Sequence, residues 1–184
     1  MHIPGHLAVG ALVALELRPR RGIPDECWGR GTLVPMWFGA LLPDLIDKPI
    51  LWTGLSVYGR TVGHSVFVWA LLSLCAAWAS TRGSRHAPTL GWVALGAVAH
   101  GFTDALEGLL MGGLNGQVWA TSWWMWPWAT PDTWSLAREG APWPSGTHWV
   151  TFEALVVAMA TWRVWATRAK KRNTRIPPND ATDM

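Results

Sequence analysis

The sequence predicts an all-α protein, an integral membrane bundle of about five apolar helices of which four or five span the bilayer. Half of its 184 residues are hydrophobic, 15% are charged and 16 are tryptophan, a balance that is too apolar for a disordered chain and unusual for a soluble one. Several segments continue for roughly 15 to 20 residues with one or two polar positions, which is typical of membrane helices that carry functional polar groups. Cys27 and Cys75 form no CxxC pair, which argues against a disulfide framework or a cysteine-based zinc site.

Five apolar segments are the expected helices, and the residues between them are the expected connections. The helices are predicted over residues 2–16, 32–46, 64–80, 90–111 and 147–166. The connections, most of them basic or rich in glycine, proline and tryptophan, are predicted over residues 18–30, 47–61, 81–86 and 112–146. Residues 1–166 are therefore expected to form one domain, and the basic residues 167–184 a disordered cytoplasmic tail.

Positive charges are distributed unevenly between the two predicted sides of the membrane. One side holds the basic tail together with Arg18, Arg20, Arg21, Arg30, Arg82 and Arg85. The other side holds only Lys48, Arg60 and Arg138. Because cytoplasmic loops carry the excess of Lys and Arg, the N-terminus is predicted outside and the C-terminus in the cytoplasm, in a multi-pass protein of the plasma (inner) membrane. This clustering favours a role in topology over nucleic-acid binding, so no nucleic-acid partner is expected.

Two carboxylates, Asp44 and Asp47, interrupt a run that is otherwise apolar from Thr32 to Trp52. Acids in such surroundings are costly unless a cation or a strong hydrogen-bond donor faces them. Lys48 and a metal ion are the candidate partners. Alternatively, Pro43 opens a short helix whose dipole favours acids in its first turn, with no function implied.

Five of the six histidines converge on one side of the predicted topology. They are His2, His6, His64, His100 and His148. These side chains lie at or near the outer ends of their helices, at the same end as Asp44 and Asp47. Imidazole nitrogens and carboxylate oxygens are ligands for divalent ions, so the convergence indicates a metal site.

The fourth predicted helix carries His100 and Asp104 four residues apart, with Glu107 following on the same stripe. Helical geometry puts residues at this spacing on one face, about one turn apart. A histidine and an aspartate so placed can offer two donor atoms to one divalent ion. The same spacing is also common in purely structural pairs, although polar groups inside an apolar helix tend to be functional.

A second tier of candidates comprises His2, Arg60, Ser65, His148 and Glu153. Arg60 is suited to hold an anionic group such as phosphate, or to anchor the chain at the membrane interface. Ser65 can cap a helix or bond a ligand, and His2 can be a ligand or simply solvated. Glu153 lies in an otherwise apolar helix and needs a partner. The candidate partners are the site, Arg163 and a neighbouring helix.

Taken in order, the motifs resemble those of a known family. They are Gly5-His6-Leu7, Leu41-Leu42-Pro43-Asp44, Arg60 to His64-Ser65, His100-x-x-x-Asp104 and Trp126-Pro127. This set resembles the membrane-bound metal-dependent hydrolases, also described as inner-membrane-associated and LexA-binding. That family is regarded as a distant relative of zinc-dependent phospholipase C and the single-strand-specific zinc nucleases. The resemblance covers roughly residues 5–128.

Carried over by position, the resemblance implies one or two divalent ions, with zinc expected. The implied ligands are His6, Asp44, His64, His100 and Asp104. The chain also departs from the family pattern. Glu153 comes five residues after His148, one residue late for the His-x-x-x-Glu helix of the phospholipases, so a trinuclear site is not expected. Asp44-x-x-Asp47-Lys48 replaces the common Asp-x-Asp-His.

The expected function is a membrane-bound metal-dependent hydrolase that acts through a metal-activated water. The lipid bilayer is an expected partner, and the resemblance implies a phosphoester substrate, either a small molecule or a lipid. Asp47 or Glu107, if unligated, would take the proton. One alternative is a metal-binding regulatory or interaction protein without turnover. Another is a small transporter that uses the His/Asp cluster as an ion path.

Overall fold

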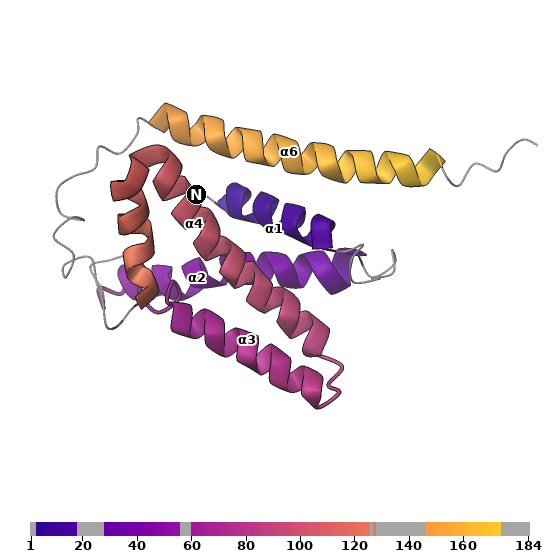
Figure 1. Ribbon diagram of the computed structural model, residues 1–184, viewed down its shortest axis with the longest axis horizontal. Coiled ribbons are helices and arrows are strands. Elements are labelled where there is room, and N and C mark those ends of the chain that lie inside the picture. Colours follow the sequence, from indigo (N-terminus) through magenta and orange to yellow (C-terminus); the bar gives the residue numbers. More distant parts are fainter. Residues whose placement is uncertain (1–2, 18–27, 56–59, 126, 128–145, 174–184) are drawn as a thin grey trace, which may run out of the picture.

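A computed structural model describes residues 3–17, 28–55, 60–125, 127 and 146–173, and every regular element in these ranges is helical (Figure 1). The long helices are α1 (Ile3–Leu17), α2 (Val34–Trp52), α3 (Val66–Thr81), α4 (Ala87–Thr121) and α6 (Gly146–Asn173). A short π-helix, η3 (Trp28–Leu33), precedes α2, and a 3-10 turn, η4 (Ser122–Met125), follows α4. The prediction of an all-α protein is therefore confirmed for the described residues.

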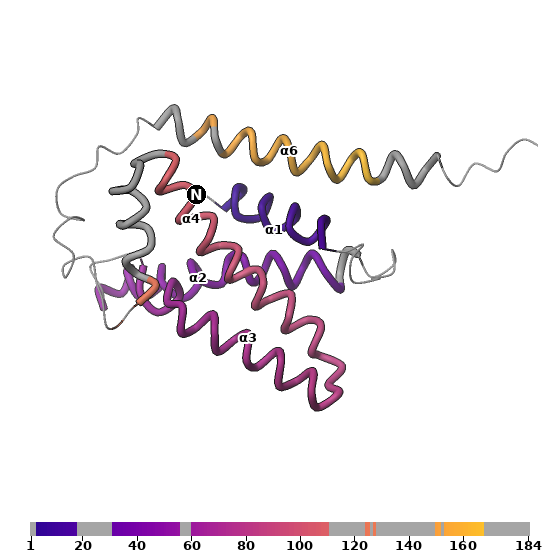
Figure 2. The backbone as a smooth tube through the Cα atoms, in the orientation of Figure 1, coloured from indigo at the N-terminus to yellow at the C-terminus, as the bar shows by residue number. Residues whose placement is uncertain are grey.

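The helices are arranged around the contact between α2 and α4, which is the most extensive in the molecule. The tube in Figure 2 shows α4 crossing α2, with α3 packed along α4. Helix α1 lies against both α2 and α4, and α6 covers α1 as an outer layer. The N-terminal halves of α1 and α2 are thus brought beside the middle of α4.

Two glycines allow α2 and α4 to approach at backbone distance. A Cβ atom on Gly39 of α2 would overlap the carbonyl group of Val93, and one on Gly96 of α4 would overlap the carbonyl oxygen of Met36. Because a glycine has no side chain, the two backbones can meet here directly. The contact lies about one turn from His100 on α4, so it determines how closely the polar residues of the two helices meet.

The interior is unusually polar. Two small apolar clusters hold the helices together, one around Ala14, Met36 and Trp92 and one around Ala8, Val156 and Ala160. Most of the largest fully buried side chains are nevertheless polar, and the buried polar set includes several ionisable groups. It comprises His6, Thr32, Asp47, Thr61, His64, Ser65, His100, Thr103, Asp104 and Glu107.

The predicted bundle of spanning helices is wrong for the described residues, because none of their helices is both long enough and apolar enough to cross a membrane. Helices α1 and α3 have 15 and 16 residues, whereas a span needs about 20. Helices α2, α4 and α6 are longer, but no stretch of them combines sufficient mean hydropathy with few charged residues. The alternation from which the orientation was predicted is lost with the spans.

Several predicted boundaries were also wrong. Helix α2 continues to Trp52 with Pro43 and Pro49 inside it, so Pro43 does not open a helix and the predicted connector over 47–61 begins as helix. Helix α4 extends ten residues into the predicted loop over 112–146, and α6 extends into the predicted tail. The rest of that tail, residues 174–184, and most of that loop lie outside the described residues.

Candidate metal centre

The structure brings together all five residues that were predicted as metal ligands. His6 comes from α1, Asp44 from α2, His64 from the segment before α3, and His100 and Asp104 from α4. They form two overlapping groups whose potential ligand atoms lie within 4.8 Å of one another, namely His64/His100/Asp104 and His6/Asp44/His100. All are buried except Asp44, whose side chain is 22% exposed. Whether they bind a metal remains a prediction.

The first group is compact. Nε2 of His100 lies 3.1 Å from Nε2 of His64. Oδ2 of Asp104 lies 3.6 Å from Nε2 of His100 and 3.5 Å from Nε2 of His64. Three donor atoms from three side chains therefore surround one point between α4 and the segment that precedes α3.

The far nitrogens of both rings are engaged by acceptors. Nδ1 of His100 lies 2.7 Å from the backbone carbonyl oxygen of Ala40, and Nδ1 of His64 lies 2.7 Å from Oδ2 of Asp47. A carbonyl or carboxylate oxygen can only accept, so we assign the ring hydrogen to Nδ1 in both histidines. Their neutral forms then present two lone pairs to each other at Nε2. Such an arrangement is repulsive unless a cation, either a proton or a metal ion, lies between them.

The spacing of the three donors fits a tetrahedral metal ion. At the zinc–ligand distances of about 2.0–2.1 Å, two donors of a tetrahedral site lie about 3.3 Å apart. The observed edges of 3.1, 3.5 and 3.6 Å are close to this value. Hydrogen bonds from Nδ1 to a carboxylate and to a backbone carbonyl are also the usual support of metal-binding histidines. The residues present therefore fit a zinc-like ion.

His6 extends the centre on the other side of Asp104. Its ring stacks on that of His100, with centroids 3.8 Å apart, and its Nε2 lies 3.6 Å from Oδ1 of Asp104. Burial, with the nearby His100, lowers the pKa of His6 to about 2, so the ring is neutral. Its buried Nδ1 has no hydrogen-bond partner in the described part of the chain. The two oxygens of Asp104 thus face different histidines, as in a carboxylate that serves two ion positions.

Asp47 is held by donors from one short segment. Its carboxylate accepts hydrogen bonds from the backbone N–H of Thr61 (2.6 Å) and of Gly63 (2.9 Å) and from the hydroxyl of Thr61 (2.8 Å), in addition to His64. Burial alone would raise the pKa of Asp47, but these hydrogen bonds, that of His64 foremost, outweigh it and lower the pKa. Asp47 thus orients His64 while its oxygens accept four hydrogen bonds, and its predicted role as a proton acceptor stays a prediction.

Lys48 does not pair with Asp47. Its Nζ lies 3.7 Å from Oδ1 of Asp44, one turn earlier on the same face of α2. The same oxygen of Asp44 lies 4.0 Å from Nε2 of His64. Asp44 thus links the partly exposed side of the site, where Lys48 lies, to the buried imidazoles.

Arg60 is the cation that neutralises Asp104. One of its guanidinium nitrogens lies 2.8 Å from Oδ2 of Asp104, and its side chain is 19% exposed. Burial raises the pKa of Asp104, but the Arg60 guanidinium, and after it the nearby imidazoles of His100 and His64, outweigh burial and hold the pKa well below the usual range. Burial lowers the pKa of His64, because it disfavours the charged imidazolium. The carboxylates of Asp104 and Asp47 raise this pKa by more, so the net change is an increase.

The remaining candidates are placed as follows. Glu107 is buried one turn after Asp104, and burial raises its pKa. Ser65 is buried and caps α3 by accepting from the N–H of Phe67. Glu153 accepts from the N–H of Gly5 at 2.9 Å and so ties α6 to the first turn of α1 beside His6. Arg163, one of its predicted partners, pairs with Glu16 instead.

Two candidates cannot be placed at the site. His2 lies outside the described residues, as does the side chain of His148, although its backbone begins α6.

Three supporting groups were not predicted from the sequence. The carbonyl of Ala40 orients His100, Thr61 supplies two of the bonds to Asp47, and the indole of Trp69 donates to the carbonyl oxygen of Gly63 at 2.9 Å. A hydroxyl residue three positions before His64 was the one available signal, since a backbone carbonyl has no signature in the sequence.

A comparison with known proteins identifies the family of this chain. No curated protein and no solved structure matches the chain. A family model described as YdjM inner membrane protein matches residues 1–175, which include every residue of the candidate centre. The resemblance to an inner-membrane-associated family is thereby supported, and the chain belongs to the YdjM inner membrane protein family.

Proposed function

We propose that this protein is a membrane-associated, metal-dependent hydrolase of phosphoesters. The observation that carries the proposal is the pair of imidazole Nε2 atoms 3.1 Å apart, each ring having its Nδ1 committed to an acceptor. His64, His100 and Asp104 would hold one divalent ion, with zinc favoured by the donor set. His6 and Asp44 would provide a second position together with His100.

A bound divalent ion would supply Lewis acidity and lower the pKa of a coordinated water toward neutrality. The chain's own residues would prepare the site for this. Asp47 and the carbonyl of Ala40 fix the orientation of the two rings and keep Nε2 free of hydrogen. Asp44 is the one partly exposed carboxylate of the cluster, so the site would open to solvent and substrate on its side.

Glu107 is the carboxyl group that we assign to proton transfer. It is buried three residues after Asp104, on the same stripe of α4, and burial raises its pKa. A carboxyl group whose pKa is moved toward the working pH is better suited to accept and release a proton. Of the two residues predicted for this role, we favour Glu107, because the carboxylate oxygens of Asp47 already accept hydrogen bonds.

Arg60 favours a phosphoester over other hydrolysable groups. Its guanidinium lies against the oxygen of Asp104 that faces both His64 and His100. A divalent ion at this point would take over the neutralisation of Asp104. Arg60 would then be available to bind a phosphate oxygen, with the fork geometry that arginine offers to phosphate.

The bilayer is the proposed place of action. The family is one of inner membrane proteins, and 21 large hydrophobic side chains are exposed on the described surface. Such extensive apolar exposure is typical of surfaces that meet a membrane or another protein. Substrate would then reach the site close to the lipid surface.

One observation favours a second candidate function. The oxygens of Asp47 are all engaged, so the site has fewer groups for proton transfer than expected. A metal-binding regulatory protein without turnover would need the ligands and their supports but no spare base. It differs from the hydrolase by predicting stoichiometric metal with no turnover.

The test combines metal analysis with an assay. Purified protein should contain about one or two equivalents of divalent metal per chain, and Co²⁺ exchanged into it should give the visible absorption of a tetrahedral site. His100→Ala should abolish both the absorption and the hydrolysis of a soluble chromogenic phosphodiester. His86→Ala, at an exposed histidine distant in sequence from the cluster, is the matched control. Metal-free protein that no added metal stabilises would overturn the proposal, whereas metal without turnover would favour the regulatory alternative.

A further inference from the structure

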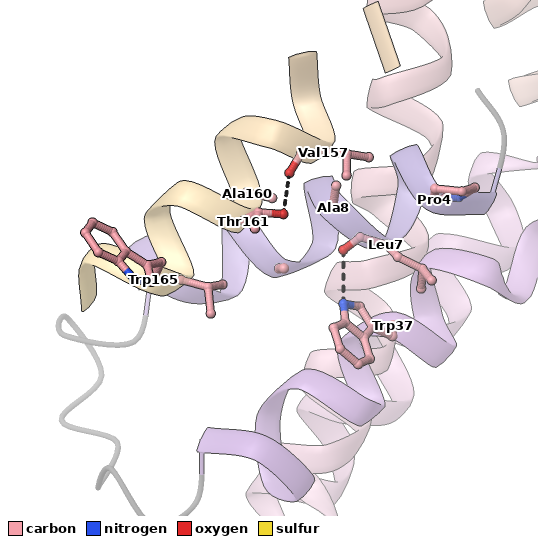
Figure 3. Close-up of a pocket in the computed structure, with 10 residues that line it drawn as sticks. Pro4, Leu7, Ala8, Trp37, Val157, Ala160, Thr161 and Trp165 are labelled. Carbon is pink, nitrogen blue, oxygen red and sulfur yellow. Dashed lines mark hydrogen bonds between the residues drawn. The ribbon is translucent and has the colours of Figure 1, made fainter. Parts of the chain in front are cut away.

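A groove lies between α1, α2 and α6, and no residue of the candidate metal centre lines it (Figure 3). Its volume is about 530 Å³, which is within the usual range for ligand sites. Small buried side chains from facing helices, Ala8 of α1 and Ala160 of α6, line it where the two helices pack together. Trp37 of α2 and Trp165 of α6 line it with large apolar surfaces. The groove therefore offers room that is bounded almost entirely by hydrocarbon.

The polar groups of the lining are largely used within the protein. The indole N–H of Trp37 donates to the carbonyl oxygen of Leu7 at 3.0 Å, and the hydroxyl of Thr161 donates to the carbonyl oxygen of Val157 at 2.8 Å (Figure 3). A sugar or a nucleotide placed here would lose its hydrogen bonds to water without replacing them, which is costly. An unbranched hydrocarbon chain forms no hydrogen bonds with water, so it would lose none in the groove.

Helix α2 connects the groove with the candidate metal centre. Trp37, Leu41 and Asp44 are spaced i, i+4 and i+7, so they lie along one face of the helix. Asp44 is about 10 Å further along the axis than Trp37. Leu41 and Asp44 are both partly exposed. A molecule with its chain in the groove could thus extend along this face, with its head at the partly exposed side of the centre.

We propose that the groove binds an acyl chain of a lipid whose phosphoester headgroup is the substrate of the metal centre. The inference rests on the proposed function and deepens it by naming the substrate class. Membership of an inner membrane protein family supplies the source of such a chain. Lys48 and Arg60, on the centre's side, complement the negative charge of the headgroup.

The experiment measures binding of octyl, decyl and dodecyl phosphocholine to the full chain by calorimetry, below their micellar concentrations. Each methylene buried in the groove should strengthen binding about fourfold. Thr161→Trp should fill the groove at an exposed position, where folding tolerates a large side chain, and abolish the dependence on chain length. Met159→Trp, on the same helix but outside the lining, should retain it.

The possible failures separate the groove from the metal centre. If binding does not depend on chain length, or if Thr161→Trp keeps the dependence, the groove proposal is wrong even where a soluble phosphodiester is hydrolysed. A second outcome is that the alkyl phosphocholines bind more tightly as their chains lengthen, that dodecanol also binds, and that no phosphoester is hydrolysed. The proposed hydrolase function is then wrong, and acyl-chain binding by the groove is supported. If Thr161→Trp instead dissociates a dimer of the wild type, a second copy of the chain occupies the groove and the proposal falls.

Discussion

The buried centre around Asp104 and the outer face of α3 place polar and apolar groups in opposite ways. At the centre, three imidazoles, two aspartates and a guanidinium are enclosed by helices, and Asp104 is only 3% exposed. On α3, Leu74 and Trp78 are 66% and 64% exposed. In a water-soluble domain, large apolar side chains are mostly inside and ionisable groups mostly outside. Here the helices enclose a polar centre and present apolar side chains outward.

This difference shows which side chains the folded state depends on most. Each buried polar group needs a partner at a particular position, so replacing one of them is costly. An exposed leucine has no particular partner, so its replacement changes the folded state little. We therefore expect a steep gradient of effect from the centre to the outer faces, and the following changes measure it.

The largest effect is expected for Asp104→Asn. It leaves Arg60 partly buried without its opposite charge, and breaking such a pair costs about 3–5 kcal/mol. Chemical denaturation of the metal-free protein would measure the loss. Glu16→Gln is the control at an exposed pair with Arg163, where less than about 1 kcal/mol is expected. Equal losses for the two variants would refute the contrast between centre and surface.

Two glycines of α4 should respond in opposite directions. Gly96→Ala places a methyl group against the backbone of α2 and should cost about 1–3 kcal/mol through overpacking. Gly91→Ala meets open space and should stabilise the helix by up to about 1 kcal/mol. Thermal unfolding of both variants checks this, and a destabilised Gly91→Ala would contradict the assigned contact between α2 and α4.

Asp47→Asn should weaken metal binding without removing a ligand. The change loosens the orientation of His64, and such supporting residues typically contribute 10–100-fold, about 1.4–2.7 kcal/mol, to metal affinity. Thr61→Val removes one of the hydrogen bonds to Asp47 and should have a smaller effect in the same direction. Competition with a metal-binding dye measures both affinities. An affinity unchanged by Asp47→Asn would mean that His64 is not a ligand.

Glu107→Gln should stabilise the protein at neutral pH more than in acid. Burial raises the pKa of Glu107 above its unfolded value, so the folded state binds its proton more tightly. The stability that this provides is present below the unfolded pKa of about 4.3 and is lost as the pH rises through the folded value. Unfolding midpoints at about pH 4 and about pH 8 would show a gain for Gln at the higher pH only. Glu107→Asp keeps a titratable carboxyl group and should keep the wild-type trend.

The smallest effect on folding is expected for Leu74→Gln on the outer face of α3. Its unfolding free energy should stay within about 0.5 kcal/mol of the wild type, because the side chain is mostly exposed. Binding to vesicles of anionic phospholipid, measured by flotation, should nevertheless weaken. Ser80→Gln, at an exposed polar position of the same helix, should alter neither quantity. Unchanged flotation of Leu74→Gln would exclude this face from contact with lipid.

Much of the candidate centre could be predicted because its signals are local. A histidine and an aspartate four residues apart in an apolar helix, as at His100 and Asp104, are conspicuous in the sequence. The length of α2 could not be predicted in this way, because Pro43 and Pro49 indicate boundaries and yet lie inside the helix. Packing against α4 stabilises α2 across them, since tertiary contacts override local propensity.

The two acids of α2 show the same difference between what the sequence predicts and what tertiary contacts decide. The sequence placed Asp44 and Asp47 in one apolar stretch and could offer Lys48 to either. Only the fold assigned them, because Gly63 lets the segment before α3 pack directly on the backbone of Pro43. This contact brings the N–H groups of that segment to Asp47 and leaves Asp44 to Lys48.

The sequence by itself determined the helical class, since helical periodicity is a property of the chain alone. The five convergent side chains were identified by the order of motifs that resembles a known family. The sequence did not determine how the helices relate to a membrane, because apolar composition does not show where a helix ends or which face it buries. The tertiary structure decided the helix lengths, the supports of His64 and His100, and the position of Arg60 against Asp104. These depend on close backbone contacts at Gly39, Gly63 and Gly96, which join residues far apart in the sequence.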